Sequence, residues 1–571
     1  MAKKATPGQS NPKVEIPHMI KDPTIIAGDR EVDHIQCTLE ARYWDGPVSN
    51  RVAVLDFDSK TGNLRRGARF IPGKAIGSFD VPRDPKYSGK KIYLTNTDAF
   101  IQTSVFGTVL RTIKLFEHKN VLGHPVRWAF NGPQLLVIPR AGEWANAFYQ
   151  RDSRSLQFFF FAPDPTSETI YTCLSRDIVA HETAHAILDG IAPDLYNALT
   201  PQALALHEAV SDLTAMLMAA ESQYLKADVL EKTRGAINDS TIFSSIAPQF
   251  GATLDRSGKA KYLRQLANKK TIQDVAGDEP HELSEVLSGS LFSVLMKMHE
   301  EHRERYVKEE KWKKYADPWF SCSGAAITAA FFRLRNSIFQ ALEYLPPGEV
   351  SFADYGRAIL TVDEGGNLNP PFVREWIRSE FLERGIVADL DELAAEVNLV
   401  YKPLQKVDFA ALIENDEQAH RFAESHREFL QIPPGVEFQV RPRQLLSKTY
   451  YDADRNEVPA SECLFKVCWP HVESRKLAHG ISKPHEILCG ATLVIDLLNK
   501  KVRARLTSDC TRTQLRDRDR MFKRLLENGL LARDRHAYAP DGNPLDSVIR
   551  LVTKNGNLQI RGTGQLLHIV E

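Results

Sequence analysis

The sequence predicts an α+β protein, and three patterns along the chain point to this class. Between residues 33 and 135, short runs of alternating apolar and polar residues are separated by turn-forming clusters such as Ser59-Lys-Thr-Gly-Asn63, as in strands joined by turns. From residue 175 to residue 386, apolar residues recur instead at helical spacing. Beyond residue 433 the alternating runs return. Strand-rich and helix-rich stretches therefore follow one another along the chain.

The first half of the chain is expected to form one sheet-bearing unit after an unstructured start. Residues 1–32 begin with two lysines but have neither an apolar core nor a cleavage site, so they are no signal peptide, and we expect them to be disordered. Residues 33–174 form the strand-rich part, with a strand predicted at Val52-Ala-Val-Leu-Asp-Phe. An amphipathic helix is predicted within it, near residues 105–116.

The second half divides into three segments. Residues 175–386 are predicted to be helical, and the charged run between His299 and His302 predicts that these two histidines face solvent. Residues 387–432 are charged and helical, and we interpret them as a linker that ends at Pro433-Pro434-Gly435. Residues 433–571 are predicted to form a β-rich domain, for which targeting, substrate choice and self-association are all open roles, including the binding of a partner.

The clearest chemical signal is a pair of histidines four residues apart. The chain contains His181-Glu-Thr-Ala-His185, and Glu208 follows 23 residues later in the phrase His-Glu-Ala-Val-Ser-Asp. Both segments have helical spacing, so the two imidazoles are expected on one helix face. That arrangement can bind one tetrahedral zinc ion, and three protein ligands leave a fourth position open, as in catalytic sites. Glu182 is placed to reach a water molecule at that position rather than the metal itself.

A second carboxylate supports this interpretation. Asp212 lies one helical turn after Glu208, where it can hold the other ring nitrogen of a ligand histidine, as residues behind metal ligands do. A bare motif of this kind arises by composition in roughly a few per cent of chains of this length. The alternative is a buried helix with two hydrogen-bonded histidines and no metal. The combined pattern favours the metal site.

Over roughly residues 100–386, and most clearly from residue 140, these motifs resemble the catalytic domain of the thermolysin family of zinc metallopeptidases, the gluzincins. The resemblance implies one zinc ion per chain, bound by His181, His185 and Glu208. It implies that Glu182 is the general base and that Asp212 orients a ligand histidine. It also implies a two-lobed fold, with a sheet-rich lobe, a helical lobe and zinc between them, followed here by the β-rich C-terminal domain.

The same resemblance assigns roles to five further residues. A tyrosine eleven residues after the second histidine, and a histidine at the start of an apolar helix, match the family's oxyanion-stabilising pair. The phrase Asn-Ala-Phe-Tyr matches its edge strand, and a Leu-Arg pair matches its carbonyl-binding arginine. The residues concerned are Tyr196 and His281 as catalytic donors, and Asn146, Ala147 and Arg264 as substrate-binding residues.

Each of these matches has an ordinary structural alternative. Tyr196 could be a loop tyrosine, and Asn146 could end a strand or form a turn. Arg264 could lie on the solvated face of a basic helix, because several lysines surround it in the sequence. His281 could simply begin a helix after Pro280.

One departure from the family concerns calcium. The family's calcium sites use a carboxylate eleven residues after the third zinc ligand, and this chain has Ala219 there, although Asp177 is kept before the zinc helix. We therefore expect that calcium is not required.

Composition narrows the partners and the compartment. Lys+Arg and Asp+Glu number 73 each, so no net charge draws the chain to nucleic acid or anionic membranes. No run of about 18 apolar residues exists, so no membrane insertion is expected. Seven scattered cysteines form no CxxC pair, which favours free thiols in a reducing compartment. These observations predict a cytoplasmic protein, with export by a route that the sequence does not show left open.

Three functions remain from the sequence. The first is a zinc endopeptidase that acts on a peptide or protein substrate. The second is a peptide-binding scaffold with little turnover, against which the intact Glu182 argues. The third is a zinc hydrolase of a non-peptide amide, against which the substrate-backbone residues Asn146 and Arg264 argue.

Overall fold

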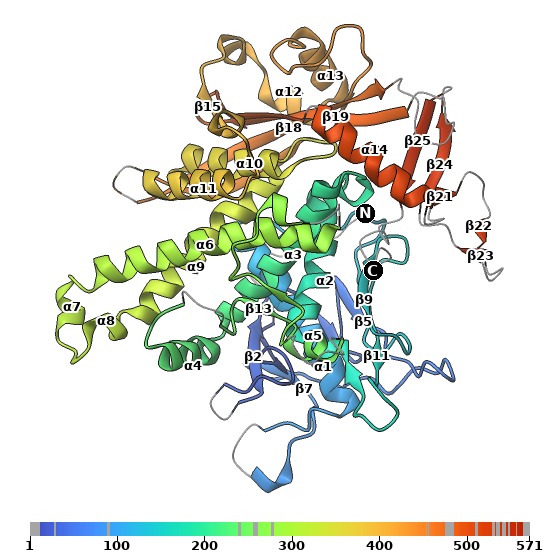
Figure 1. Ribbon diagram of the computed structural model, residues 1–571, viewed down its shortest axis with the longest axis vertical. Helices are drawn as coiled ribbons and strands as arrows, with labels where there is room; N and C mark the ends of the chain where they lie inside the picture. Colours follow the sequence, from blue (N-terminus) through green and yellow to red (C-terminus); the bar gives the residue numbers. More distant parts are fainter. Residues whose placement is uncertain are drawn as a thin grey trace.

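The computed structural model confirms the α+β class. It describes residues 12–27, 30–87, 92–237, 241–254, 261–275, 279–452, 454, 456–473, 485–508 and 512–527, and the backbone of short strands between residues 531 and 562. In Figure 1 the N-terminal strands lie at the bottom, the long C-terminal strands lie at the top, and helices fill the space between them. All cysteines within the described residues are free and buried.

Regular structure begins nearer the N-terminus than the sequence analysis predicts. β1 (Val14–Met19) pairs with β2 (Val32–Cys37) and with β7 (Gly77–Phe79). It lies inside the four-stranded sheet β2-β1-β7-β6, which β6 (Phe70–Ile71) completes. The side chains of Val14 and Ile16 are fully buried there. The expectation that residues 1–32 are disordered is therefore wrong for residues 12–27 and 30–32, and residues 1–11 lie outside the described part.

A second sheet carries the edge strand that later borders the site. Its order is β3-β4-β5-β8-β10-β9, which begins with β3 (Tyr43–Trp44) and β4 (Val48–Ser49). Within it β5 (Val52–Val54), β8 (Leu135–Ile138) and β10 (Ser155–Phe158) run parallel. β9 (Ala147–Gln150) ends the sheet and pairs only with β10, antiparallel, among the described strands. The long helix α1 (Asp98–Phe116), capped by Thr97, packs against β1, β5 and α2 (Arg176–Ile191).

Helices make up the centre of the molecule. α2 (Arg176–Ile191) packs against α3 (Pro201–Glu221), and α3 packs against α6 (Pro280–Tyr306). α9 (Ser323–Tyr344), α10 (Phe352–Gly366) and α11 (Pro371–Glu383) complete the group. One described helix, α3, is long and apolar enough to span a membrane, but it is wholly buried in the protein.

His299 and His302 are buried, contrary to the expectation that they face solvent. Each is about 1% exposed, because α6 runs on to Tyr306 and packs against α9. The neighbouring glutamates on α6 point outward, so the charged run marks only one side of the helix. Burial lowers the pKa of His299 to about 4, which keeps its imidazole neutral at pH 7.

The segment 387–432 is not a linker. β15 (Glu396–Leu399) pairs with β20 (Lys501–Ser508) and so begins the C-terminal sheet. α13 (Asp416–Ser425) packs beside the same sheet through Phe422, which contacts the ring of Phe465. The predicted boundary at residue 433 therefore lies inside one packed unit, which starts near residue 390.

The β-rich character of the C-terminal region is confirmed for the described residues. β17 (Gln444–Tyr451), β18 (Glu457–Glu473), β19 (His485–Asp496) and β20 form an antiparallel series with α14 (Arg512–Glu527) after it. A buried polar cluster joins this sheet to α9. The Tyr344 hydroxyl lies 2.9 Å from that of Tyr450 and donates to Glu462 at 2.9 Å.

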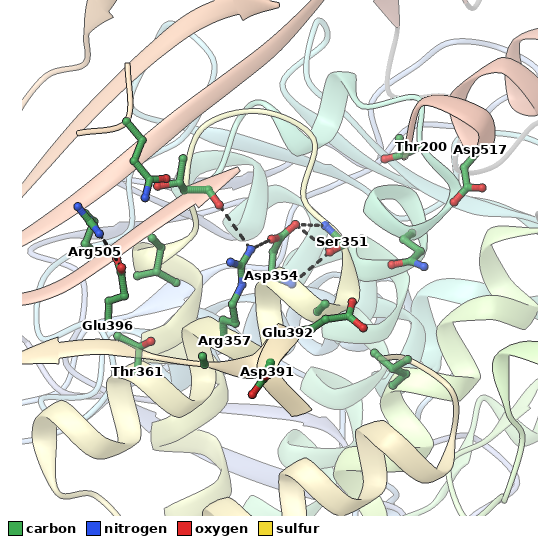
Figure 2. Close-up of a pocket in the computed structure, with 17 residues that line it drawn as sticks. Thr200, Ser351, Asp354, Arg357, Thr361, Asp391, Glu392, Glu396, Arg505 and Asp517 are labelled. Atoms are coloured by element: carbon green, nitrogen blue, oxygen red, sulfur yellow. Dashed lines mark hydrogen bonds and ion pairs between the residues drawn. The ribbon is translucent and has the colours of Figure 1, made fainter. Parts of the chain in front are cut away.

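A large cavity lies where α10 meets β15 and β20 (Figure 2). Its two arginines are already paired: Arg357 contacts Asp354, and Arg505 donates twice to Glu396 at 2.5 Å. Asp354 also caps α10 through Ser351, as the dashed lines in Figure 2 show. Both arginines therefore have a carboxylate partner within the cavity wall, and Asp391, Glu392 and Asp517 add further carboxylates to the lining.

A buried ion pair joins the N-terminal segment to α2. The ammonium group of Lys21, which is fully buried, contacts the Asp177 carboxylate and donates to the carbonyl of Ser245 at 3.0 Å. The same carboxylate accepts the N–H of Ala247 at 3.1 Å. Asp177 is the acidic residue that the family resemblance connects with calcium, and here a lysine supplies the positive charge beside it.

We predict that Lys21→Met destabilises the protein by about 3–5 kcal/mol, because it leaves a buried carboxylate without its counter-charge. Urea denaturation measures the loss. The double variant Lys21→Met/Asp177→Asn is the control and should recover much of it. Equal stability of the single and double variants would contradict a role for this pair.

Candidate metal centre

Two packed helices present the site. α2 brings His181, Glu182 and His185, and α3 brings Glu208 and Asp212, all of them buried. The histidines lie four residues apart and therefore one turn apart on the same face of α2. The face of α3 that packs against these histidines carries residues 207, 208, 211 and 212. These residues share one face because they are three to four positions apart.

Three donor groups converge between these helices: two imidazoles and one carboxylate. The Nε2 atoms of His181 and His185 lie 3.0 Å apart. One oxygen of Glu208 lies 3.1 Å from the first nitrogen, and the other lies 3.3 Å from the second. A tetrahedral zinc ion with bonds of about 2.0–2.1 Å separates its donors by about 3.3 Å. The spacing of the three donors therefore fits such an ion.

The state of Glu208 supports the same interpretation. Its side chain is fully buried, and its oxygens lie 3.1 Å from His181, 3.3 Å from His185 and 3.4 Å from His281 without an aligned N–H hydrogen bond. A buried carboxylate normally accepts hydrogen bonds or binds a cation. Because the nearest atoms are the two imidazole nitrogens, a cation bound between them accounts for the arrangement.

Glu182 is a second carboxylate close to the same donors. Atoms of His181, Glu182 and His185 that can bind a metal all lie within 4.8 Å of one another. Distance alone thus makes both glutamates candidates for a metal ligand. Glu208 contacts both imidazoles directly, whereas Glu182 also accepts a hydrogen bond from the backbone of Tyr149 on β9 and borders the open pocket. Glu208 is therefore the better-placed candidate for a metal ligand, and Glu182 is the better-placed candidate for a proton acceptor.

The far side of the first imidazole is fixed by an ion pair. His181 Nδ1 lies 3.0 Å from Asp212, and the guanidinium of Arg264 holds the same carboxylate with bonds of 2.7 and 2.9 Å. Arg264 lies on β14 (Arg264–Gln265), not on a helix, and is 8% exposed. The alternative of a solvated basic face is therefore wrong. Its first role in this structure is to orient Asp212.

His281 reaches the site from the first turn of α6. Its Nε2 lies 3.4 Å from Glu208, and its Nδ1 lies 2.9 Å from Glu279. Its side chain is 15% exposed and borders the pocket. Thus an imidazole from the third helix of the group points at the same centre.

A small pocket, partly open to solvent, leads to His181, Glu182 and His281. Asn146 and Ala147 border it where β9 begins, and the Asn146 side chain accepts the N–H of Ala147 at 2.7 Å. Its remaining walls are mainly apolar. The polar lining residues His181, Glu182, Arg264, His281 and Thr172 are joined by Ile178, Ile246, Ala247, Phe250 and Leu263.

Tyr196 is not among the residues that line this pocket. Its hydroxyl accepts the backbone N–H of Arg151 at 3.1 Å, and the Arg151 guanidinium lies 4.3 Å from the centre of its ring. Burial raises the pKa of Tyr196 to about 12, so the hydroxyl keeps its proton. The structure thus places Tyr196 against Tyr149 and Arg151, at the end of β9, and outside the lining of the pocket.

A further network ties β9 to α2. The Tyr149 hydroxyl donates to Asp189 at 2.8 Å, and Arg151 donates to the same carboxylate at 2.8 Å. Asp189 follows His185 by one turn of α2, so the edge strand and the histidines are held by one helix. Sequence reasoning missed this network, because the contact between strand and helix leaves no local pattern.

The carboxylates of the site favour positive charge between the helices. Burial lowers the pKa of His181, but Glu208 and Asp212 outweigh it and raise the value to about 10. Burial raises the pKa of Glu208, yet the three surrounding histidines hold it well below its usual range. Burial also raises the pKa of Glu182, to about 8. Either a proton or a metal ion can supply the charge that the carboxylates attract.

Comparison with known proteins adds no assignment. No protein-family model matches the chain, and no curated protein matches it. The interpretation of the site therefore depends on its own residues.

The two glutamates can be distinguished by metal content. Glu208→Gln should lose bound zinc, because it removes a charged donor, whereas Glu182→Gln should keep close to one zinc per chain. Elemental analysis after dialysis measures both variants, with circular dichroism to confirm folding. The reverse pattern, or no zinc in the unaltered protein, would contradict the assignment.

Proposed function

We propose that the protein is a zinc-dependent endopeptidase with its centre between α2 and α3. The observation that carries the proposal is the convergence of the His181, His185 and Glu208 donors, 3.0–3.3 Å apart, with Glu182 beside them at an open pocket. Structural zinc sites are closed by four protein ligands, and catalytic sites keep one position open. His181 and the adjacent Glu182 line the pocket, whereas His185 and Glu208 are buried and are not part of its lining. The centre is therefore open on the side of His181, which supports a catalytic site.

We further propose the two-lobed arrangement of the thermolysin family for this part of the chain. The sheet that ends in β9 then corresponds to the first lobe, and the helices from α3 to α11 correspond to the second. The placement of Asp212, Arg264 and His281 around one centre supports this proposal, because these residues come from three separate elements and were all expected there from the resemblance. The C-terminal unit has no counterpart in this two-lobed arrangement.

Glu182 carries the proton in the proposed reaction. Bound zinc supplies Lewis acidity, which polarises the scissile carbonyl and makes water nucleophilic at neutral pH. Glu182 accepts the proton of the attacking water at a carboxylate oxygen and delivers it to the leaving amine. The N–H of Tyr149 holds its side chain toward β9, where the peptide is expected to lie.

His281 is the better supported of the two oxyanion donors. Its Nε2 points toward the centre from the pocket wall, so an N–H there can donate to the oxygen that becomes negative. Tyr196 keeps a proton that it can donate, but the pocket does not include it. A role for Tyr196 therefore requires β9 and the loop before α3 to adjust when substrate binds.

The edge strand and the pocket walls support a peptide substrate. β9 ends its sheet next to the pocket, and an extended peptide can add to such an edge by backbone hydrogen bonds. Ile178 and Leu263 are on the apolar side of the pocket, which favours an apolar residue after the cleaved bond. Scaffold and non-peptide amidase functions are the alternatives, and the buried, positioned Glu182 and the adjacent edge strand weigh against them.

Turnover tests the proposal. A proteome-derived peptide library, incubated with the zinc-loaded protein and analysed by mass spectrometry, should show internal cleavage that a chelator abolishes. Glu182→Gln is the matched control, because it should keep zinc while losing activity by several orders of magnitude. Binding of peptides without cleavage would favour a scaffold, and chelator-sensitive activity retained in Glu182→Gln would contradict the mechanism.

The oxyanion donors give a separate kinetic prediction. His281→Ala should lower kcat about a hundredfold with little change in KM and without loss of zinc, because its hydrogen bond strengthens only in the transition state. Tyr196→Phe should have the same signature if Tyr196 turns toward the substrate. Steady-state kinetics with one cleaved peptide measures both. An unchanged kcat in either variant removes that residue from the reaction.

A further inference from the structure

His207 stands directly behind the second candidate ligand. It is fully buried on α3, next to Glu208 in the sequence, and its Nδ1 lies 2.8 Å from Nδ1 of His185. The two rings are nearly stacked, with centroids 5.0 Å apart and an angle of 29°. Ser211, one turn further along α3, places its hydroxyl 3.3 Å from the same nitrogen.

The contact fixes which nitrogen carries each proton. A hydrogen bond between two ring nitrogens needs one N–H and one lone pair. Nε2 of His185 faces the other donors, so its lone pair points to the metal position and its proton is on Nδ1. Nδ1 of His207 is then the acceptor, and the proton of His207 is on its own Nε2.

A purely structural role explains this imidazole poorly. Its Nε2 is buried without a hydrogen-bond partner among the described residues. An unsatisfied buried donor lowers stability, and a leucine of similar size would avoid that cost. The contact with His185 is therefore the gain that offsets it.

The Nδ1 atoms of the two candidate ligand histidines therefore have different hydrogen-bond partners. His181 is held by the carboxylate of Asp212, which Arg264 also binds, whereas His185 is held by a neutral imidazole and a hydroxyl. We propose that His207 is a positioning residue that fixes the tautomer and ring orientation of His185 for zinc binding. This inference rests on the proposed zinc site.

Zinc affinity tests the inference independently of turnover. His207→Leu removes the acceptor and keeps a similar volume, and it should weaken zinc binding roughly 10–100-fold in competition with a chelator of known affinity. His207→Asn keeps an acceptor oxygen and should restore affinity to within a few-fold of the unaltered protein. Ser211→Ala is the control for the weaker contact and should change affinity only slightly.

Two further readouts separate positioning from folding. Without zinc, the melting temperature of His207→Leu should change little. The substitution removes the unsatisfied Nε2–H of His207, but it leaves the Nδ1–H of His185 with only the Ser211 hydroxyl, at 3.3 Å. The visible spectrum of the cobalt-substituted protein should shift in His207→Leu and return toward the original in His207→Asn.

The outcomes distinguish this inference from the proposed function. If the unaltered protein binds no zinc, the proposed function fails and this inference fails with it. If the unaltered protein binds zinc and His207→Leu binds it equally well, only the role of His207 is overturned. Equal weakening in His207→Leu and His207→Asn would also overturn it, because the acceptor would then not matter.

Discussion

Helices α2 and α3 pack against each other along a buried contact, and every other part of the site depends on that packing. It brings two imidazoles from one helix against a face of the other that carries His207, Glu208, Ser211 and Asp212. Such polar groups are costly to bury unless they satisfy one another or bind a cation. The apolar residues around them hold the helices together, and the polar residues determine what the contact can bind.

The sequence predicted those parts of the site that follow from helical spacing. The positions of His181, His185, Glu208 and Asp212 relative to one another follow from four-residue intervals on two helices, and the structure brings all four together. The alternative that put Arg264 on a basic helix is wrong, because Arg264 lies on a strand whose pairing with β13 (Ser245–Ile246) is a tertiary contact without a local signal. His207 was missed because its partner is on another helix.

The errors in the fold have related causes. β1 is short and follows a polar terminus, so its burial depends on β2, β7 and α1, which come later in the chain. β15 was placed in a linker because its partner, β20, lies about a hundred residues further on. His299 was predicted to face solvent because its neighbours in the sequence are charged, but it lies on the buried face of α6. In all three, contacts distant in sequence decided the outcome.

X-ray absorption at the zinc edge tests the central claim most directly, because it reports the donors around the metal in solution. The account predicts two imidazole nitrogens and one carboxylate oxygen from the protein at about 2.0–2.2 Å, with a further light-atom donor that an inhibitor can replace. Loss of one imidazole contribution in His185→Ala would support the assignment. A sulfur donor, four protein ligands, or an unchanged spectrum in that variant would contradict it.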